Sequence, residues 1–184
     1  MYIVPIIKKI AYYILYIVFW FLEHIVSKRD IILMQTYNPQ VYCDNTKYLF
    51  EYLSNNTDYD VFWITENSKI VEYLNENNFK YLDRSKKIDY LYSLYLVLKS
   101  KVIIDSGTNF FNPLNLKLDK TVKITTFHGN GPKTVVTNQE TLNETMEELF
   151  DMNSFDYINF TSDFLIKKCG RMVYHIPNKK LINF

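Results

Sequence analysis

The stretch DVFWITENSKIVEYL, residues 60–74, contains one complete strand-to-helix unit. Residues 60–65 form a short apolar run, which is typical of a strand buried in a sheet. Ser68 follows this run, and Ile70, Val71 and Leu74 then recur at helical spacing. The stretch therefore predicts a strand that is followed directly by a helix.

Similar units recur along most of the chain. Short apolar runs predict further strands over residues 31–34, 79–82, 101–105, 121–127 and 155–160. One helix is predicted to begin after a cap at Asp44 or Asn45, and another to begin at Ser85. Their apolar positions are Tyr48, Leu49, Tyr52 and Leu53 in the first helix, and Ile88, Leu91, Tyr92, Tyr95 and Leu98 in the second.

The alternation continues towards the C-terminus. Residues 139–150 suit a surface helix or lid, Thr161 or Ser162 is expected to cap a further helix, and Gly170 lies where a helix C-terminal glycine is common. Repeated strand–helix–strand units predict an α/β fold, a Rossmann-like parallel sheet with helices on both faces. Such sheets bind ligands at the carboxyl ends of their strands.

Length and composition indicate one globular domain. The chain has 184 residues, of which 48% are hydrophobic and 22% are charged, and this suffices for a hydrophobic core without disulfides. The formal net charge is +1, with no long basic block, so nucleic acid is not an expected partner. Cys43 and Cys169 lie far apart and form no C-x-x-C pair, and we expect both thiols to be reduced.

An uncharged segment, residues 10–22, precedes the first predicted strand. Its thirteen residues are fewer than the about 18–20 that a membrane span requires. A helical wheel separates two stripes, one of Ile10, Ile14, Ile17, Phe21 and Ile25, the other of Lys9, Tyr13, Tyr16, Trp20 and Glu23. Because Tyr and Trp favour the headgroup region and Lys attracts anionic lipid, residues 1–27 are predicted to form an amphipathic helix in the bilayer surface.

Lys28 and Arg29 follow this segment, as expected of a cytoplasmic flank. We therefore expect a peripheral protein on the cytoplasmic face of the cell membrane, with residues 28–184 forming the Rossmann-like domain. Three alternatives remain open. They are a signal peptide with a poor cleavage site, a tilted span that buries Lys8 and Lys9, and a core helix.

The loop TFHGNGPK, residues 126–133, offers the most chemistry. A hydrophobic strand would deliver His128 to the ligand-binding edge, where a neutral imidazole can accept a hydroxyl proton. Gly129 and Gly131 allow the backbone to approach a ligand closely. Lys133 and the loop amides, including that of Asn130, can hold a phosphate. The alternative is a structural histidine in a turn.

Ser106 and Gly107 end another predicted strand and are weaker candidates for lining an acceptor site. An ordinary strand-end turn explains them equally well. The loop over residues 35–45, at the end of the first predicted strand, is an equally weak candidate. The sequence contains neither G-x-G-x-x-G nor G-x-x-x-x-G-K-[ST], which excludes a dinucleotide fingerprint and a P-loop. The three histidines are scattered, so we expect neither a metal site nor a cofactor.

Residues 30–184 resemble the CDP-glycerol glycerophosphotransferases, which build teichoic-acid-like polymers. The family carries a Trp-His-Gly-Thr-Pro-Leu-Lys-like loop, which is matched here by Phe127-His128-Gly129 and by Lys133. Residues 44–53 are similar to the first helix of the family and residues 61–65 to its second strand. Residues 155–158, followed by Thr161-Ser162, are similar to its later strand and serine-bearing turn.

The resemblance implies a GT-B fold, in which two Rossmann-like halves enclose the reaction cleft. This chain would be the N-terminal, acceptor-side half. His128 would be the general base that deprotonates the terminal glycerol hydroxyl of a membrane-linked acceptor. That hydroxyl would attack the β-phosphorus of CDP-glycerol and release CMP. Because the nucleotide sits mainly in the C-terminal half of the family fold, the isolated chain is expected to bind CDP-glycerol weakly and to be inactive alone.

Two departures from the family pattern stand out. Phe127 replaces the usual Trp, and Asn130-Gly131-Pro132 replaces Thr-Pro-Leu. Family sequences also continue beyond the equivalent of Phe184 into the nucleotide domain, so we expect either a truncated product or a second half supplied by a partner. Two alternatives are half of a GT-B glycosyltransferase for capsule or wall polysaccharide, and a non-catalytic membrane-bound remnant.

Overall fold

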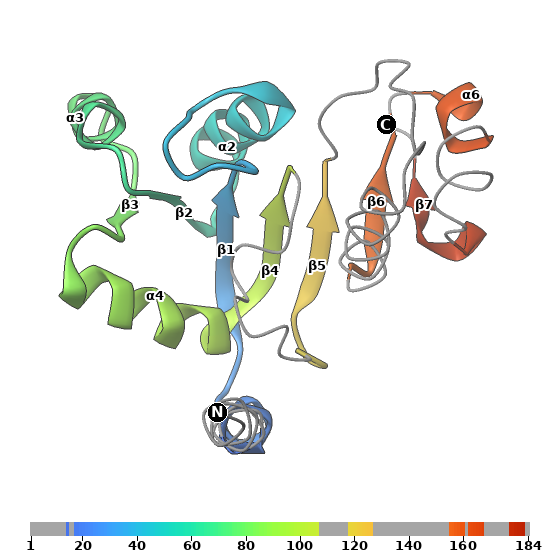
Figure 1. Cartoon of the computed structure of the whole chain (residues 1–184), viewed down its shortest axis with the longest axis horizontal. Coiled ribbons are helices and arrows are strands. Elements are labelled where there is room, and N and C mark those ends of the chain that lie inside the picture. The colour runs from blue at the N-terminus through green and yellow to red at the C-terminus, as the bar shows by residue number, and fades with distance from the viewer. Residues whose placement is uncertain are drawn as a thin grey trace, which may run out of the picture.

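The computed structural model describes residues 14, 17–106, 118–126, 155–160, 162–167 and 177–182. They form a parallel sheet of seven strands in the order β3-β2-β1-β4-β5-β6-β7 (Figure 1). The strands are β1 (Arg29–Gln35), β2 (Asp60–Thr65), β3 (Tyr81–Asp83), β4 (Ser100–Asp105), β5 (Val122–Thr125), β6 (Tyr157–Asn159) and β7 (Leu181–Ile182). The helices are α2 (Asp44–Asn56), α3 (Ser68–Glu76), α4 (Lys87–Lys99), α6 (Asp163–Leu165) and the 3-10 turn η2 (Asn178–Lys180).

The sheet grows in two directions from β1. The chain first adds β2 and β3 on one side of β1, and it then adds β4 on the other side, followed by β5, β6 and β7. All six neighbouring pairs are parallel. The reversal of direction makes the carboxyl ends of β1 and β4 the topological switch point of the sheet. The predicted Rossmann-like parallel sheet is therefore confirmed.

Helices cover both faces of the sheet. Successive residues of a strand point to opposite sides, so their neighbours show which helix covers which face. Ile31 of β1 belongs to a buried cluster that includes Leu96 of α4. The next residue, Ile32, belongs to a second cluster, which includes Phe50 of α2 and Leu74 of α3. The sheet thus separates α4 from α2 and α3, and a core lies on each side of it.

The strand-to-helix unit at residues 60–74 forms as predicted. β2 covers residues 60–65 and α3 begins at Ser68. The side chain of Asn67 accepts a hydrogen bond from the backbone N–H of Lys69 at 2.9 Å, which caps the helix. Ile70 and Leu74 are buried against the sheet. The residues within this unit are therefore sufficient to predict its strand and its helix.

The predicted cap of α2 is wrong. The helix begins at Asp44, Cys43 is its N-cap residue, and no side chain caps it. Neither Asp44 nor Asn45 therefore acts as the cap. Asp44 has a φ of 63°, a left-handed conformation that Asp tolerates better than most residues. Of the predicted apolar positions, Leu49 and Leu53 pack against the core, whereas Tyr48 and Tyr52 are exposed, at 68% and 61%.

The predicted apolar face of α4 is also wrong. The helix begins at Lys87 and not at Ser85. Its buried residues are Ser93, Leu96, Val97 and Leu98. Of the predicted apolar positions, only Leu98 is among them. The others are exposed, at 79% for Ile88, 57% for Leu91, 45% for Tyr92 and 45% for Tyr95.

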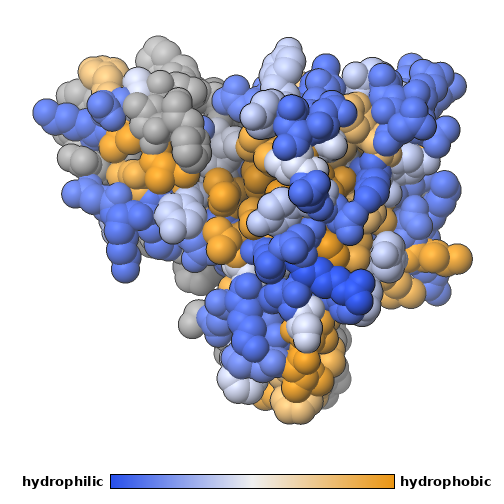
Figure 2. All heavy atoms as spheres, turned by 180° about the vertical axis from the view of Figure 1, so that it is seen from behind, coloured by the Kyte–Doolittle hydropathy of each residue, from blue (hydrophilic) through white to orange (hydrophobic). Residues whose placement is uncertain are grey.

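The N-terminal helix is described at residue 14 and at residues 17–25, and it exposes an apolar face. The described members of the predicted apolar stripe, Ile14, Ile17, Phe21 and Ile25, are 56%, 62%, 57% and 61% exposed, and Ile10 lies outside the described residues. In Figure 2 hydrophobic side chains gather on this helix, at the bottom of the view, beside hydrophilic ones. Within the described ranges, no helix has the length and apolar character needed to cross a bilayer.

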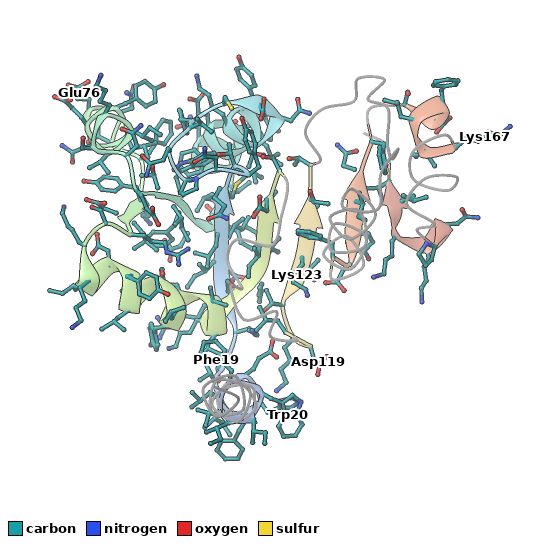
Figure 3. The ribbon with its side chains drawn as sticks, viewed as in Figure 1. Phe19, Trp20, Glu76, Asp119, Lys123 and Lys167 are labelled. Atoms are coloured by element: carbon teal, nitrogen blue, oxygen red, sulfur yellow. The ribbon has the colours of Figure 1, made fainter. Side chains whose placement is uncertain are left out.

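Glu23 attaches this helix to the sheet. Its side chain is fully buried and accepts hydrogen bonds from the backbone N–H groups of Asp119 at 2.8 Å and Lys120 at 2.9 Å. Lys28 forms an ion pair with the same carboxylate at 3.2 Å. Burial lowers the pKa of Lys28, and the adjacent Glu23 opposes this change. Figure 3 shows Asp119 just above the helix that carries Phe19 and Trp20.

The C-terminal part completes the sheet. Ser162 caps α6 as predicted, because its hydroxyl accepts a hydrogen bond from the N–H of Leu165 at 3.3 Å. The sequence did not predict β7, which pairs with β6 through Leu181 and Ile182. The helix predicted over residues 139–150, the glycine at 170 and the second cysteine at 169 lie outside the described residues.

Candidate functional site

A buried polar pair lies at the switch point of the sheet. Gln35 ends β1, Asp105 ends β4, and the two residues are register partners. Both are fully buried. The side-chain amide of Gln35 donates a hydrogen bond to Oδ2 of Asp105 at 3.0 Å. Ligands of doubly wound sheets bind outside this edge, so the pair forms the floor of the candidate site.

The loop after β1 is attached to the same strand end. The backbone N–H of Tyr37 donates to the hydroxyl of Ser106 at 3.0 Å. Among the described residues, Oε1 of Gln35 has no hydrogen-bond partner, although it is buried. Buried polar atoms are nearly always paired, because burying one without a partner costs about 1–3 kcal/mol. This oxygen is therefore an acceptor that a group outside the described residues can satisfy.

β5 contributes the third strand end. The backbone N–H of Thr126 donates to the carbonyl oxygen of Asp105 at 2.8 Å. The Thr126 hydroxyl lies 2.8 Å from the hydroxyl of Thr46, which comes from the first turn of α2. Thr46 is fully buried and Thr126 nearly so. These bonds fix the position at which the chain leaves β5 and enters the loop of His128.

The structure describes only one of the predicted site residues. Ser106 lies at the carboxyl edge, as predicted for an acceptor-lining residue of the sheet. Gly107, His128, Gly129, Asn130, Gly131 and Lys133 lie outside the described residues. The strand ends that precede these loops are nevertheless described. Hydrogen bonds link Gln35 to Asp105, Asp105 to Thr126 and Thr126 to Thr46, and Ser106, next to Asp105, accepts from the backbone N–H of Tyr37; these residues are the strand-end cluster.

Sequence reasoning missed Thr46 and the pairing of Gln35 with Asp105. The signal for Gln35 and Asp105 was present, since each is the first polar residue after a buried apolar run. Thr46 carried no such signal, because it lies in the first turn of a helix and contacts Thr126 only through the fold. Within the described part of the chain, no three His, Cys, Asp or Glu side chains come together as metal ligands would.

Gln35→Met should destabilise the protein by about 1–3 kcal/mol, because the buried Asp105 carboxylate loses a donor. Methionine has a similar volume, so little of the effect would come from a cavity. Urea unfolding followed by circular dichroism measures the change. Gln40→Met, at an exposed position in the same loop region, is the control and should stay within about 0.5 kcal/mol of wild type. Equal effects of the two variants would contradict the assigned pair.

Solved structures of a teichoic acid polymerase share this fold. The wall teichoic acid polymerase TagF aligns with a TM-score of 0.61 at 15% identity, covering 84% of this chain and 38% of the polymerase. A histidine-to-asparagine variant of TagF soaked with CDPG for 15 minutes aligns with a TM-score of 0.61 at 14% identity, covering 85% of this chain and 38% of that one. The chain thus spans well under half the length of these polymerase chains.

A glycosyltransferase from Rickettsia africae ESF-5 has a related fold. It aligns with a TM-score of 0.52 at 14% identity, covering 83% of this chain and 42% of that chain. At these identities the likenesses concern the fold alone. A search of curated proteins gave no significant match.

The family assignment comes from the sequence of nearly the whole chain. The model of the family described as CDP-Glycerol:Poly(glycerophosphate) glycerophosphotransferase matches residues 14–183. The matched range contains the strand-end cluster and the His128 loop. The chain therefore belongs to the CDP-glycerol:poly(glycerophosphate) glycerophosphotransferase family.

Proposed function

We propose that this chain is the acceptor-side part of a transferase that moves glycerol phosphate from CDP-glycerol to a membrane-linked acceptor. The product would be teichoic acid or a related cell-surface polymer. The observation that carries the proposal is the family match over residues 14–183, which includes the His128 loop. The strand-end cluster supports it, because that cluster lies where parallel α/β sheets bind their ligands.

The chain itself limits the distance between His128 and this edge. His128 follows Thr126 by two residues, and two residues of extended chain span at most about 7 Å. Thr126 is hydrogen-bonded to Asp105 and Thr46 at the edge. A base at position 128 is therefore within reach of an acceptor hydroxyl bound over β4 and β5.

The proposed reaction is one displacement at phosphorus. His128 takes the proton of the terminal glycerol hydroxyl, and the oxygen attacks the β-phosphorus of CDP-glycerol. A phosphodiester bond forms to the acceptor, the bond between the β-phosphorus and the bridging oxygen breaks, and CMP leaves with that oxygen. Lys133 and the amides of Gly129, Asn130 and Gly131 hold an acceptor phosphate. Ser106 and Gly107 line the acceptor side of the site.

The function is tested by transfer of labelled glycerol phosphate. The chain spans 38% of TagF, so the assay supplies a nucleotide-binding domain in trans and offers CDP-glycerol with a lipid-linked glycerophosphate acceptor. The proposal expects label in the lipid-linked polymer only when both parts are present. Incorporation from a nucleotide sugar instead would favour the glycosyltransferase alternative, which the shared fold with the Rickettsia enzyme supports. No incorporation from either donor would favour a non-catalytic remnant.

A location on the cytoplasmic face of the membrane is part of the proposal, and the exposed apolar face of residues 14–25 supports it. Ile17→Gln/Phe21→Gln should move most of the protein from the membrane pellet to the supernatant, because apolar contact with the bilayer is lost. Deleting residues 1–27 is a poorer test, because it also removes Glu23 and its contacts. Fractionation at low salt measures the distribution.

The control for this prediction is Tyr48→Gln/Tyr52→Gln. These two side chains are equally large and exposed, at 68% and 61%, but they lie on α2. The control protein should remain in the pellet. A wild-type chain that stays in the supernatant at low salt would contradict the proposed location.

A further inference from the structure

α4 carries an exposed apolar face that the fold leaves uncovered in the described residues. Ile88, Leu91, Tyr92 and Tyr95 follow the i, i+3, i+4, i+7 spacing of one helical face, and their exposures range from 45% to 79%. The opposite side of α4 supplies Leu96 and Val97 to the core. Contiguous exposed apolar faces of this kind mark interaction sites.

The C-terminal end of α4 lies near the N-terminal helix. Arg29 of β1 and Ser100 of β4 are Cα partners in the sheet. The N-terminal helix ends at residue 25, shortly before Arg29, and α4 ends at Lys99, directly before Ser100. The C-terminal ends of both helices therefore meet at the amino ends of β1 and β4, on the lower side of the molecule in Figure 1.

Both helices expose apolar residues on this side. Hydrophobic side chains are visible on the N-terminal helix, at the bottom of Figure 2, and again over α4, at the lower right of the same view. The candidate site lies at the other end of the strands, at Gln35 and Asp105. Occupation of this apolar surface therefore leaves the carboxyl edge of the sheet open.

The charges and aromatic rings around this face suit an anionic bilayer. Arg29, Lys99, Lys101 and Lys120 lie near the ends of the two helices. The exposed acidic groups Asp30 and Asp60 form ion pairs with Lys101 and Lys80, and Asp119 is also exposed. At the other end, Lys86 pairs with Asp83 through an ion pair, and Lys87 begins the helix. The basic excess near these helix ends favours anionic headgroups.

The tyrosines of α4 also suit the surface of a bilayer. The rings of Tyr92 and Tyr95 stack with centroids 6.0 Å apart. Nζ of Lys99 lies 5.0 Å from the ring centroid of Tyr95. Tyrosine with adjacent lysine is typical of the membrane–water interface, where the ring enters the acyl boundary and the cation meets phosphate. An apolar partner protein would not require this rim of cations.

We propose that α4 is a second lipid-contacting element, and that it and the N-terminal helix together seat the chain on an anionic phospholipid bilayer. The proposal rests on the membrane location proposed above, but not on the transfer reaction. The two helices are joined to one rigid sheet, so their simultaneous contact fixes the orientation of the sheet on the membrane. Two linked contacts also bind more tightly than one.

Vesicle flotation tests this with the full chain. The probes are vesicles of phosphatidylcholine alone and of phosphatidylcholine with phosphatidylglycerol. Wild type should float with the second kind and much less with the first. Ile88→Gln/Leu91→Gln and Tyr92→Gln/Tyr95→Gln should each weaken binding to the anionic vesicles about tenfold, because apolar contact is lost. Glutamine is a good helix former, so α4 should persist, and circular dichroism checks this.

Each result decides the proposal. The matched control, Tyr48→Gln/Tyr52→Gln on α2, should bind anionic vesicles like wild type. If the α4 variants bind like wild type while Ile17→Gln/Phe21→Gln does not, the N-terminal helix alone contacts lipid and the α4 proposal fails. The proposal also fails if the α2 control loses as much binding as the α4 variants. It fails too if the α4 variants change the sedimenting mass and not vesicle binding, because that identifies a face between copies.

Failure here is distinguishable from failure of the proposed function. Transfer of glycerol phosphate to a detergent-solubilised acceptor does not require a bilayer and should be unchanged in the α4 variants. Absence of vesicle binding in the wild type would overturn the membrane location and the α4 contact together. The transfer reaction would remain to be judged by its own assay.

Discussion

His128→Ala should lower turnover by about 10²–10⁴-fold in a complex that contains a nucleotide-binding domain, because this is the usual contribution of a general base. The base acts on the acceptor hydroxyl mainly in the transition state, so the acceptor KM should change little. Initial rates of glycerol-phosphate transfer over a range of acceptor concentrations separate the two parameters.

His128→Asn separates catalysis from support of the loop. Asparagine can replace a hydrogen bond of the imidazole, but it cannot take up a proton at neutral pH. If His128 is the base, the Asn variant should be as slow as the Ala variant. Near-normal turnover of His128→Asn in an otherwise active complex would exclude the catalytic role and leave a structural loop histidine.

Lys133→Ala is the companion variant. A lysine that holds an acceptor phosphate should affect binding more than chemistry, so its replacement should raise the acceptor KM and leave turnover nearer to wild type. The contrast between positions 128 and 133 therefore assigns the two roles within one loop. Equal losses of turnover at both positions would contradict this division.

Glu23→Ala should destabilise the protein by about 3–5 kcal/mol, which is the usual result of removing one partner of a buried ion pair. Two backbone N–H groups, those of Asp119 and Lys120, lose their acceptor. Lys28 loses its ion-pair partner while it stays largely buried, with 12% of its side chain exposed. Urea unfolding with tryptophan fluorescence measures the loss.

Two further variants check the reason for this effect. Glu76→Ala replaces an exposed glutamate at the end of α3, far from Asp119 in Figure 3, and should change stability by no more than about 0.5 kcal/mol. Glu23→Ala/Lys28→Ala should recover part of the loss, because the unpaired buried cation is also removed. If Glu23→Ala is as stable as Glu76→Ala, Glu23 does not attach the N-terminal helix to the sheet.

Strands β1 to β6 and the α3 unit were predictable because their signals are local. β2 and the start of α3 fall where the run DVFWIT and Ser68 place them. Short apolar runs bounded by polar residues identify buried parallel strands without any knowledge of their neighbours. Repetition of such runs with helices between them leaves few topologies, since parallel connections are right-handed and short. The same locality explains why Ser162 was found as the cap of α6.

The face of α4 was not predictable in this way, and that of α2 only in part, through Leu49 and Leu53. α4 is apolar on more than one side, with Ile88, Leu91 and Tyr92 on one face and Leu96 and Val97 on another. A helical period identifies a face only when the opposite side is polar. The fold decides which side of α4 packs on β1, and the other side is left for solvent or lipid. In α2, Tyr48 and Tyr52 also recur at helical spacing, but the fold leaves both side chains exposed.

The sequence by itself determined the α/β class, the strands β1 to β6 and the family likeness of the His128 loop, because each of these depends on residues that are close together in the chain. Only the tertiary structure decided the contacts of Glu23 with Asp119, of Gln35 with Asp105 and of Thr46 with Thr126, which join residues 96, 70 and 80 positions apart. The sequence around a single polar residue does not indicate which distant residue will be its hydrogen-bond partner. Such a partner is chosen when the strands align and water is excluded, since a buried polar group must then find one within the fold.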